Sequence, residues 1–222
     1  MCCSLAGPLL LSFDKKVAFY KKWRYVFPAM IFPGIFYIVW DAIFTANGIW
    51  HFNNDYIIGA KLFGLPAEEI AFFFIVPYCC SFIYECIRCY FPRFSGPKNN
   101  WVYQFLAITL FFAAIFFHDR DYTFYTCLFT AVFLCCYVVF KKHFTGFNPN
   151  VFLIAYLIIL LPFLIVNGLL TSIPVVIYNN AENMGVRIYT IPVEDVFYGM
   201  LLAFMNIAGF EKLRNRSVIS NS

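Results

Sequence analysis

The stretch "GLPAEEIAFFFIVPY", residues 64–78, places two adjacent carboxyl groups, Glu68 and Glu69, at the head of an apolar run. The run continues to about residue 88, so it is as long as the roughly 20 residues that cross a bilayer as a helix. A second stretch, "YTIPVEDVFYGM", residues 189–200, repeats the arrangement with Glu194 and Asp195. Ionisable groups are costly beside hydrocarbon, so acids in matching places on two such runs are functional candidates.

The composition of the whole chain is that of a membrane protein. The sequence is 62% hydrophobic and 13% charged, whereas a soluble domain is about a quarter charged. Lipid offers no partner for backbone polar groups, so such runs are expected to be helices. The sequence therefore predicts an all-α integral membrane protein of about seven transmembrane helices, although the first run is too short to span by itself at about 1.5 Å per residue. The runs lie near residues 1–13, 25–44, 66–88, 101–118, 122–140, 151–171 and 192–210.

Basic residues are concentrated in alternate loops. Of the 16 Lys and Arg residues, all but Lys61, Arg120 and Arg187 follow the first, third, fifth or seventh run or lie at its C-terminal end. Because Lys and Arg accumulate on the cytoplasmic side, this alternation predicts a multi-pass protein of the cell membrane. Its N-terminus is expected outside and its C-terminus in the cytoplasm.

An internal repeat relates the two halves of the chain. Adding 126 to a position in the first half reaches a like residue in the second, so Glu68 matches Glu194 and Glu69 matches Asp195. One departure stands out, because Asp41 matches Asn167. We predict two parallel three-helix repeats, residues 1–92 and 122–222, joined by a linking helix within 93–121. Parallel repeats are related by an axis along the membrane normal, and their seam is the natural site.

The acids have a structural interpretation and a chemical one. Acids in the first turn of a helix suit its dipole, and Glu85, three residues before Arg88, is expected to form an ion pair at a helix end. The pairs at 68–69 and 194–195 are different, because they could face each other across the seam. Two carboxyl groups in a dry site repel each other, so one of them keeps its proton near neutral pH.

A neutral carboxylic acid beside phenylalanine rings can protonate a carbon–carbon double bond, and aromatic quadrupoles stabilise the resulting cation. The neighbouring carboxylate can then remove a proton. This pattern predicts an acid-initiated cyclase or isomerase that acts on a polyene dissolved in the membrane. The catalytic candidates are Glu68, Glu69, Glu194, Asp195 and Asp41, and the substrate-binding candidates are Trp40, Phe72, Phe73, Tyr198 and Asn167.

Other classes of function have weaker support. No GxGxxG, P-loop, HExxH or GxSxG pattern occurs, so dinucleotide, nucleotide and hydrolase chemistry is not indicated. The expected partners are the bilayer and a lipophilic polyene, with no nucleic acid, no cofactor and no metal. Two alternatives stay open at this point. One is a related carotenoid or terpenoid enzyme, either a hydratase that quenches the same cation with water or a cyclase of another polyene. The other is a non-enzymatic seven-helix transporter or receptor whose acids bind a cation.

Four stretches resemble the lycopene cyclase domain family, which comprises membrane-integral carotenoid cyclases found as heterodimers or fused two-repeat chains. They are "LLLSFDKKVAFYKKWRYVFPA" (9–29), "WDAIFTANGIWHFN" (40–53), "GLPAEEIAFFFIVPY" (64–78) and "IPVEDVFYGM" (191–200). The resemblance extends over almost the whole chain. It implies lycopene β-cyclase activity in carotenoid biosynthesis, in which the ends of lycopene become β-ionone rings (γ- or β-carotene) without net oxidation. It carries over to the two acid pairs and to Asp41.

Overall fold

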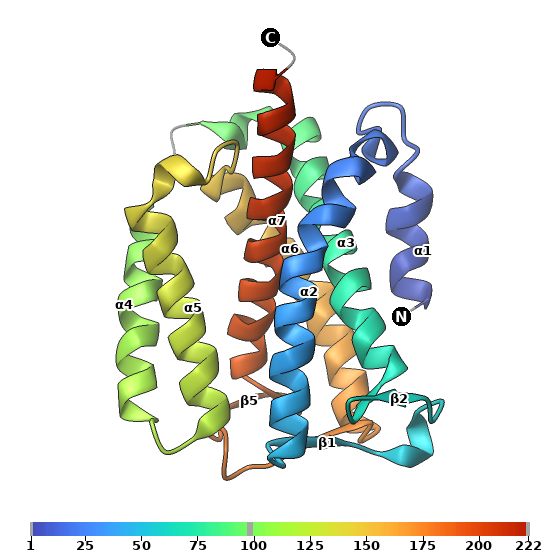
Figure 1. Cartoon of the computed structure of the whole chain (residues 1–222), viewed down its shortest axis with the longest axis vertical. Helices are drawn as coiled ribbons and strands as arrows, with labels where there is room; N and C mark the ends of the chain where they lie inside the picture. The colour runs from blue at the N-terminus through green and yellow to red at the C-terminus, as the bar shows by residue number, and fades with distance from the viewer. Residues whose placement is uncertain (1, 97–99, 221–222) are drawn as a thin grey trace.

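A computed structural model describes residues 2–96 and 100–220 as a bundle of helices (Figure 1). The seven helices of the described residues are α1 (Cys2–Leu11), α2 (Trp23–Ala46), α3 (Ala67–Tyr90), α4 (Trp101–Phe116), α5 (Asp121–Val139), α6 (Pro149–Ser172) and α7 (Glu194–Ser220). Single 3-10 turns form η1 (Phe19–Lys22), η2 (Asn54–Tyr56), η3 (Pro92–Ser95) and η4 (Lys141–His143). The prediction of a helical architecture is confirmed.

Five of the described helices are long and apolar enough to cross a membrane, namely α2 (with η1), α3, α5, α6 and α7. Helix α1 has 10 residues and α4 has 16. At 1.5 Å per residue both are shorter than the roughly 30 Å hydrocarbon core of a bilayer. The chain is therefore a membrane protein with five full-length candidate spans and two shorter apolar helices, where the sequence led us to expect about seven spans.

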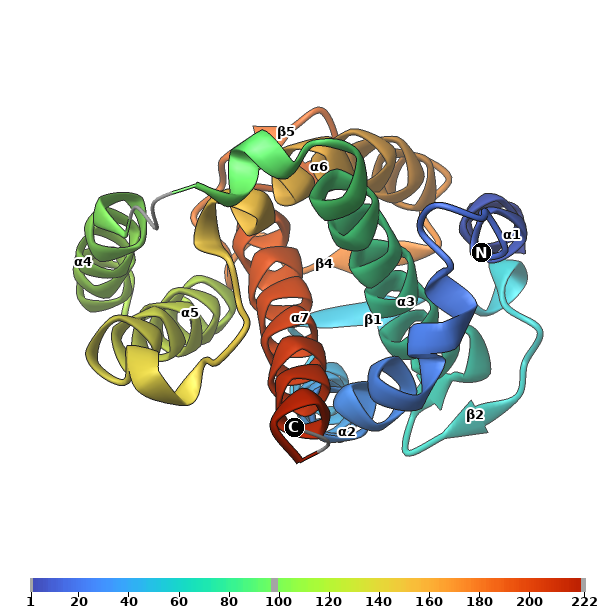
Figure 2. The same ribbon diagram turned by 90° about the horizontal axis from the view of Figure 1, so that it is seen from above.

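Helix α7 forms the centre of the bundle. It contacts α2, α3, α5 and α6, whereas α4 packs along the outer side of α5 and α1 packs beside α3 (Figure 2). Small residues allow the closest approach: a Cβ added to Gly209 of α7 would lie 3.4 Å from the Cβ of Ala29 on α2. Without a hydrophobic drive between helices in lipid, close backbone approach of this kind is what holds membrane helices together.

Short strands join the loops at the end of the bundle opposite the C-terminus (Figure 1). The antiparallel pairs are β1 (Trp50–Phe52) with β4 (Val176–Tyr178), β2 (Lys61–Leu62) with β3 (Leu65–Pro66), and β5 (Arg187–Ile188) with β6 (Ile191–Pro192). Helix α2 ends at Ala46, and Gly48, two residues later, has a φ of +73°, the left-handed conformation that closes many helices. The amide of Ile49 then bonds the carbonyl of Phe44 (3.0 Å), which turns the chain into β1.

A cluster of ion pairs joins the C-terminal ends of α3 and α7, at the end of the bundle away from the strands. Glu85 and Glu211 are fully buried. Arg88 contacts both acids, at 2.6 Å and 3.6 Å, and Arg214 bonds Glu85 at 3.1 Å and also pairs with Glu211. The ammonium group of Lys22 adds a contact to Glu85 at 2.6 Å. The expected pairing of Glu85 with Arg88 is confirmed, and it belongs to a larger network that joins α2, α3 and α7.

We expect Glu85→Gln to lower the free energy of unfolding by about 3–5 kcal/mol, because it leaves buried cations without their partner. The control is Asp119→Asn, which neutralises an exposed acid in the turn between α4 and α5. Thermal denaturation of both variants in one detergent measures the difference. Equal melting temperatures for the two variants would show that the ion-pair cluster does not stabilise the bundle.

Candidate active site

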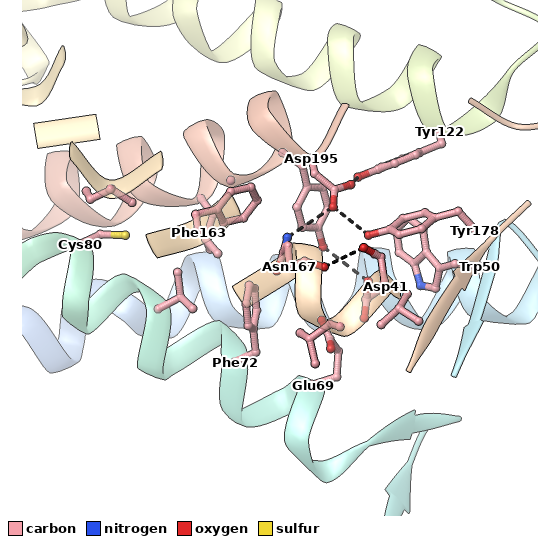
Figure 3. Close-up of a pocket in the computed structure, with 18 of the residues that line it drawn as sticks. Asp41, Trp50, Glu69, Phe72, Cys80, Tyr122, Phe163, Asn167, Tyr178 and Asp195 are labelled. Atoms are coloured by element: carbon pink, nitrogen blue, oxygen red, sulfur yellow. Dashed lines mark hydrogen bonds between the residues drawn. The ribbon is translucent and has the colours of Figure 1, made fainter. Parts of the chain in front are cut away.

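A cavity of about 70 Å³ lies between α2, α3, α6 and α7, next to β1 and β4 (Figure 3). Three carboxyl groups, from Asp41, Glu69 and Asp195, line it together with the amide of Asn167. The rest of the wall consists of phenols, indole, phenyl rings and aliphatic groups. The aromatic lining residues are Trp50, Phe52, Phe72, Tyr122, Tyr156, Phe163, Tyr178 and Tyr198.

Asp195 is held by donors from three elements. It lies in the first turn of α7, directly after β6, and is almost completely buried. The hydroxyl of Tyr122 on α5 donates to its Oδ1, and the hydroxyl of Tyr178 on β4 donates to its Oδ2 at 2.9 Å. The amide of Asn167 on α6 donates to Oδ2 at 3.4 Å. A carboxylate only accepts hydrogen bonds, so this arrangement orients Asp195 as an acceptor facing the cavity.

Asp41 and Glu69 form the other side of the site. Asp41 lies on α2, is 3% exposed, and accepts a long hydrogen bond (3.5 Å) at Oδ1 from the hydroxyl of Tyr198. Its Oδ2 is buried and has no hydrogen-bond partner among the described residues. Glu69 is half-buried in the first turn of α3. Lys and Arg are absent from the described residues that line the cavity, so these acids have no cationic partner there.

The aromatic candidates occupy two different layers. Phe72 and Tyr198, two of the residues predicted to bind substrate, line the cavity. Trp40 and Phe73 are buried behind this wall, with the Trp40 ring 5.0 Å from the ring of Tyr198. Tyr37, which the sequence analysis did not single out, packs edge-on against Tyr198 at 4.7 Å. The second layer therefore holds Tyr198 in place rather than touching the cavity.

The first acid of each pair has a different environment from the second. Glu68 Oε1 accepts the amide of Ile58 at 2.6 Å, and Glu194 Oε1 accepts the amide of Met184 at 2.7 Å. The hydroxyl of Thr123 also donates to Glu194 at 2.5 Å. Neither acid lines the cavity. Both instead tie the preceding loop to the start of the helix that follows it.

The sequence analysis missed Trp50, Tyr122, Tyr178 and Phe163, which also line the cavity. A signal existed for Tyr178, because it matches Phe52 in the 126-residue shift and differs from it by one hydroxyl. Tyr122 gave no such signal. It follows the polar turn before α5, and only the packing of α5 beside α7 directs its hydroxyl to Asp195.

Comparison with known proteins identifies the family. The family described as lycopene cyclase matches residues 1–87 and 119–213. A bifunctional lycopene cyclase/phytoene synthase of Pyrenophora tritici-repentis is 33% identical over 87 residues, 35% of this chain and 15% of that protein. The protein of the same name from Podospora anserina is 42% identical over 63 residues, 28% of this chain and 11% of that protein. The matched part is thus a small fraction of each relative. No solved structure matches the chain.

The family match extends over most of the chain and includes both helices that carry an acid pair, together with Asp41 and Asn167. The chain belongs to the lycopene cyclase family.

Proposed function

We propose that the protein is a lycopene β-cyclase that closes the ends of lycopene into β-ionone rings inside the membrane. One observation carries this proposal: Asp41, Glu69 and Asp195 come from three helices to one cavity whose other walls are mostly aromatic and aliphatic. Acids without cationic partners can exchange protons, and aromatic rings can stabilise a carbocation. Family membership supports the same chemistry.

The reaction is balanced without an oxidant. A carboxylic acid adds a proton to the terminal double bond of the polyene, and the positive charge falls on the substituted carbon. The π electrons of a double bond further along the chain attack this carbon, which closes a six-membered ring and leaves the cation on a ring carbon. Loss of a ring proton to a carboxylate forms the new double bond. One proton enters and one leaves, so the product is an isomer of the substrate.

We assign proton donation to the side of Asp41 and Glu69, and proton removal to Asp195. Asp41 has one buried oxygen without a partner among the described residues, which leaves room for an O–H directed at substrate. Asp195 already accepts hydrogen bonds from Tyr122 and Tyr178, an arrangement that suits a carboxylate. Glu68 and Glu194 position the loops in this proposal and do not touch the substrate.

We also propose that the chain is a duplication with a two-fold axis through its centre, made of residues 1–92 and 122–222 with the linking helix in 93–121. Adding 126 to the bounds of α2 yields those of α6, and the same shift carries β1, β2 and β3 onto β4, β5 and β6. In the β1–β4 pair, Trp50 faces Tyr178 and Phe52 faces Val176. Exchanging equivalent residues leaves this register unchanged, as a two-fold axis between the strands requires.

For orientation, we propose that the end with the strands faces outward and the end with the C-terminus faces the cytoplasm of the cell. The loops that hold most of the Lys and Arg residues lie at the end that carries the C-terminus (Figure 1). Positive residues favour the cytoplasmic side. The candidate active site then lies near the outer face of the membrane.

Expression in cells that accumulate lycopene tests the activity. We expect the red pigment to be replaced by γ- or β-carotene of unchanged mass, detected by chromatography with mass spectrometry. A product heavier by one water would instead identify a hydratase that uses the same cation. Unchanged lycopene beside folded, membrane-inserted protein would contradict both enzymatic functions.

Adjacent residues provide a matched test of the site. Glu69→Gln should lower turnover by about 10²–10⁴-fold, the usual contribution of a general acid or base. Glu68→Gln should retain most of the activity, because the Gln carbonyl can still accept the amide of Ile58. Asp195→Asn and Glu194→Gln repeat the comparison on α7. If the two variants of a pair lost turnover equally, the assignment of one acid to proton transfer and of its neighbour to loop positioning would be contradicted.

Topology is tested by two tags. A reporter fused after residue 216 should report the cytoplasm, and a tag in the loop 172–190 should be labelled by an impermeant reagent on intact cells. These results follow from the distribution of Lys and Arg. Both tags on the same side of the membrane would rule out this orientation.

A further inference from the structure

An apolar groove of about 290 Å³ adjoins the acid cavity between α1, α3 and α6. The cavity and the groove share lining residues, which are Phe72, Val76, Cys80, Ile159, Phe163 and Asn167. In Figure 3, Phe72 and Phe163 lie between the acids and Cys80, where the two spaces meet. Ser4 and Pro162 line the other part of the groove and are exposed. The groove therefore connects the acids to the lateral surface of the bundle.

The volumes of the acid cavity and the groove indicate that a polyene would occupy both at once. A cavity of roughly 150 Å³ holds a single benzene ring, so the acid cavity, at about 70 Å³, cannot enclose the end of a polyene by itself. The groove supplies the missing volume, and its surface is almost entirely apolar. An extended hydrocarbon chain whose end lies beside the acids would have the rest of its length in this groove.

The equivalent seam on the other side of the bundle does not reach the acids. A groove of about 530 Å³ lies there between α2 and α5, but it shares no lining residue with the acid cavity. Under the 126-residue shift, Pro162, Phe163 and Val166 of α6 correspond to Phe36, Tyr37 and Trp40 of α2. Tyr37 is fully buried and Trp40 is 5% exposed. The ring of Phe129 on α5 packs 5.7 Å from Phe36 and 4.9 Å from Trp40.

The flanking helices differ in the same way. Thr130 and Leu134 of α5 are buried beside α7. Under the 126-residue shift they correspond to two residues of the short helix α1, Ser4, which is exposed, and Pro8, which is half-buried. Aromatic rings thus separate the groove beside α2 from the acid cavity, whereas the groove between α3 and α6 is continuous with that cavity.

We propose that the polyene enters from the bilayer between α3 and α6, beneath α1, and that this seam is the one entrance to the acids among the residues that the structure describes. The reacting end lies in the acid cavity and the remainder of the chain lies in the groove. A linear substrate then presents one end for each binding event, and the second end reacts only after release and re-entry. This inference rests on the proposed cyclase function.

Val166→Trp tests the entrance, because it introduces at the groove the residue that α2 carries at the equivalent, closed position. Pro162→Phe is a second variant of the same kind, copying Phe36. The matched control is Leu161→Trp, which adds the same ring to α6 at a site that is 71% exposed and outside the groove. Size-exclusion profiles and melting temperatures identify variants that have not folded.

Binding is measured separately from turnover. Each substitution is combined with Glu69→Gln, and the lycopene that co-purifies per mole of protein in detergent is determined by absorbance. We expect Val166→Trp and Pro162→Phe to lower bound lycopene and turnover by about tenfold, the change that corresponds to losing roughly 55 Å² of buried apolar contact. Leu161→Trp should bind and turn over lycopene as the parent protein does.

The outcomes separate this inference from the proposed function. If the parent protein cyclises lycopene and the folded groove variants match Leu161→Trp in binding and turnover, the entrance is wrong and the cyclase function stands. If the parent protein leaves lycopene unchanged, the cyclase function itself fails.

A time course tests single-ended access. With lycopene in excess, monocyclic γ-carotene should accumulate free in the membrane before any dicyclic product forms. Formation of β-carotene from the first turnovers, without free γ-carotene, would overturn the proposal that one end reacts for each binding event.

Discussion

Ionisable groups inside this bundle depend on the protein for their partners, because lipid provides none. The two ends of the bundle satisfy this constraint differently. Glu85 and Glu211 face Arg88, Arg214 and Lys22, so their negative charges are balanced by cations. Near the strands, Asp195 is held by two phenols and an amide and Asp41 by one phenol, with no Lys or Arg among the described residues of the cavity wall. Acids of the first kind join helices through ion pairs, and acids of the second kind are the ones to which we assign proton transfer.

The proposed duplication explains how a symmetric scaffold carries an asymmetric site. The loop-binding acids, Glu68 and Glu194, receive amides from equivalent loop positions in the two halves. The acids that face the cavity do not have equivalent surroundings. Asp195 receives a phenol from Tyr178, whereas Phe52 occupies the matching position near Glu69 and has no hydroxyl. A polyene end is itself asymmetric, and it requires a proton on one side and an acceptor on the other.

The same asymmetry extends to access. Aromatic residues on α2 and α5 separate one seam from the acids, and the groove beside α6 occupies the other. In the proposed cyclase, a single apolar entrance would draw the carotenoid from the bilayer and keep water away from the cation. In this proposal the entrance and the proton-transfer groups follow from departures at a few matched positions of a duplicated scaffold.

The sequence by itself determined the class of the protein and the approximate bounds of its helices, because apolar runs in lipid have only one way to satisfy their backbone groups. The 126-residue shift also indicated which acids occupy matching positions. The tertiary structure decided which acid of each pair faces the cavity. Glu68 and Glu69 are adjacent and chemically identical, and helical geometry points neighbouring side chains about 100° apart, so only the packed loop and helices distinguish them. Tyr122 and the groove between α3 and α6 likewise depend on contacts between segments far apart in the chain, and no local pattern in the sequence records such contacts.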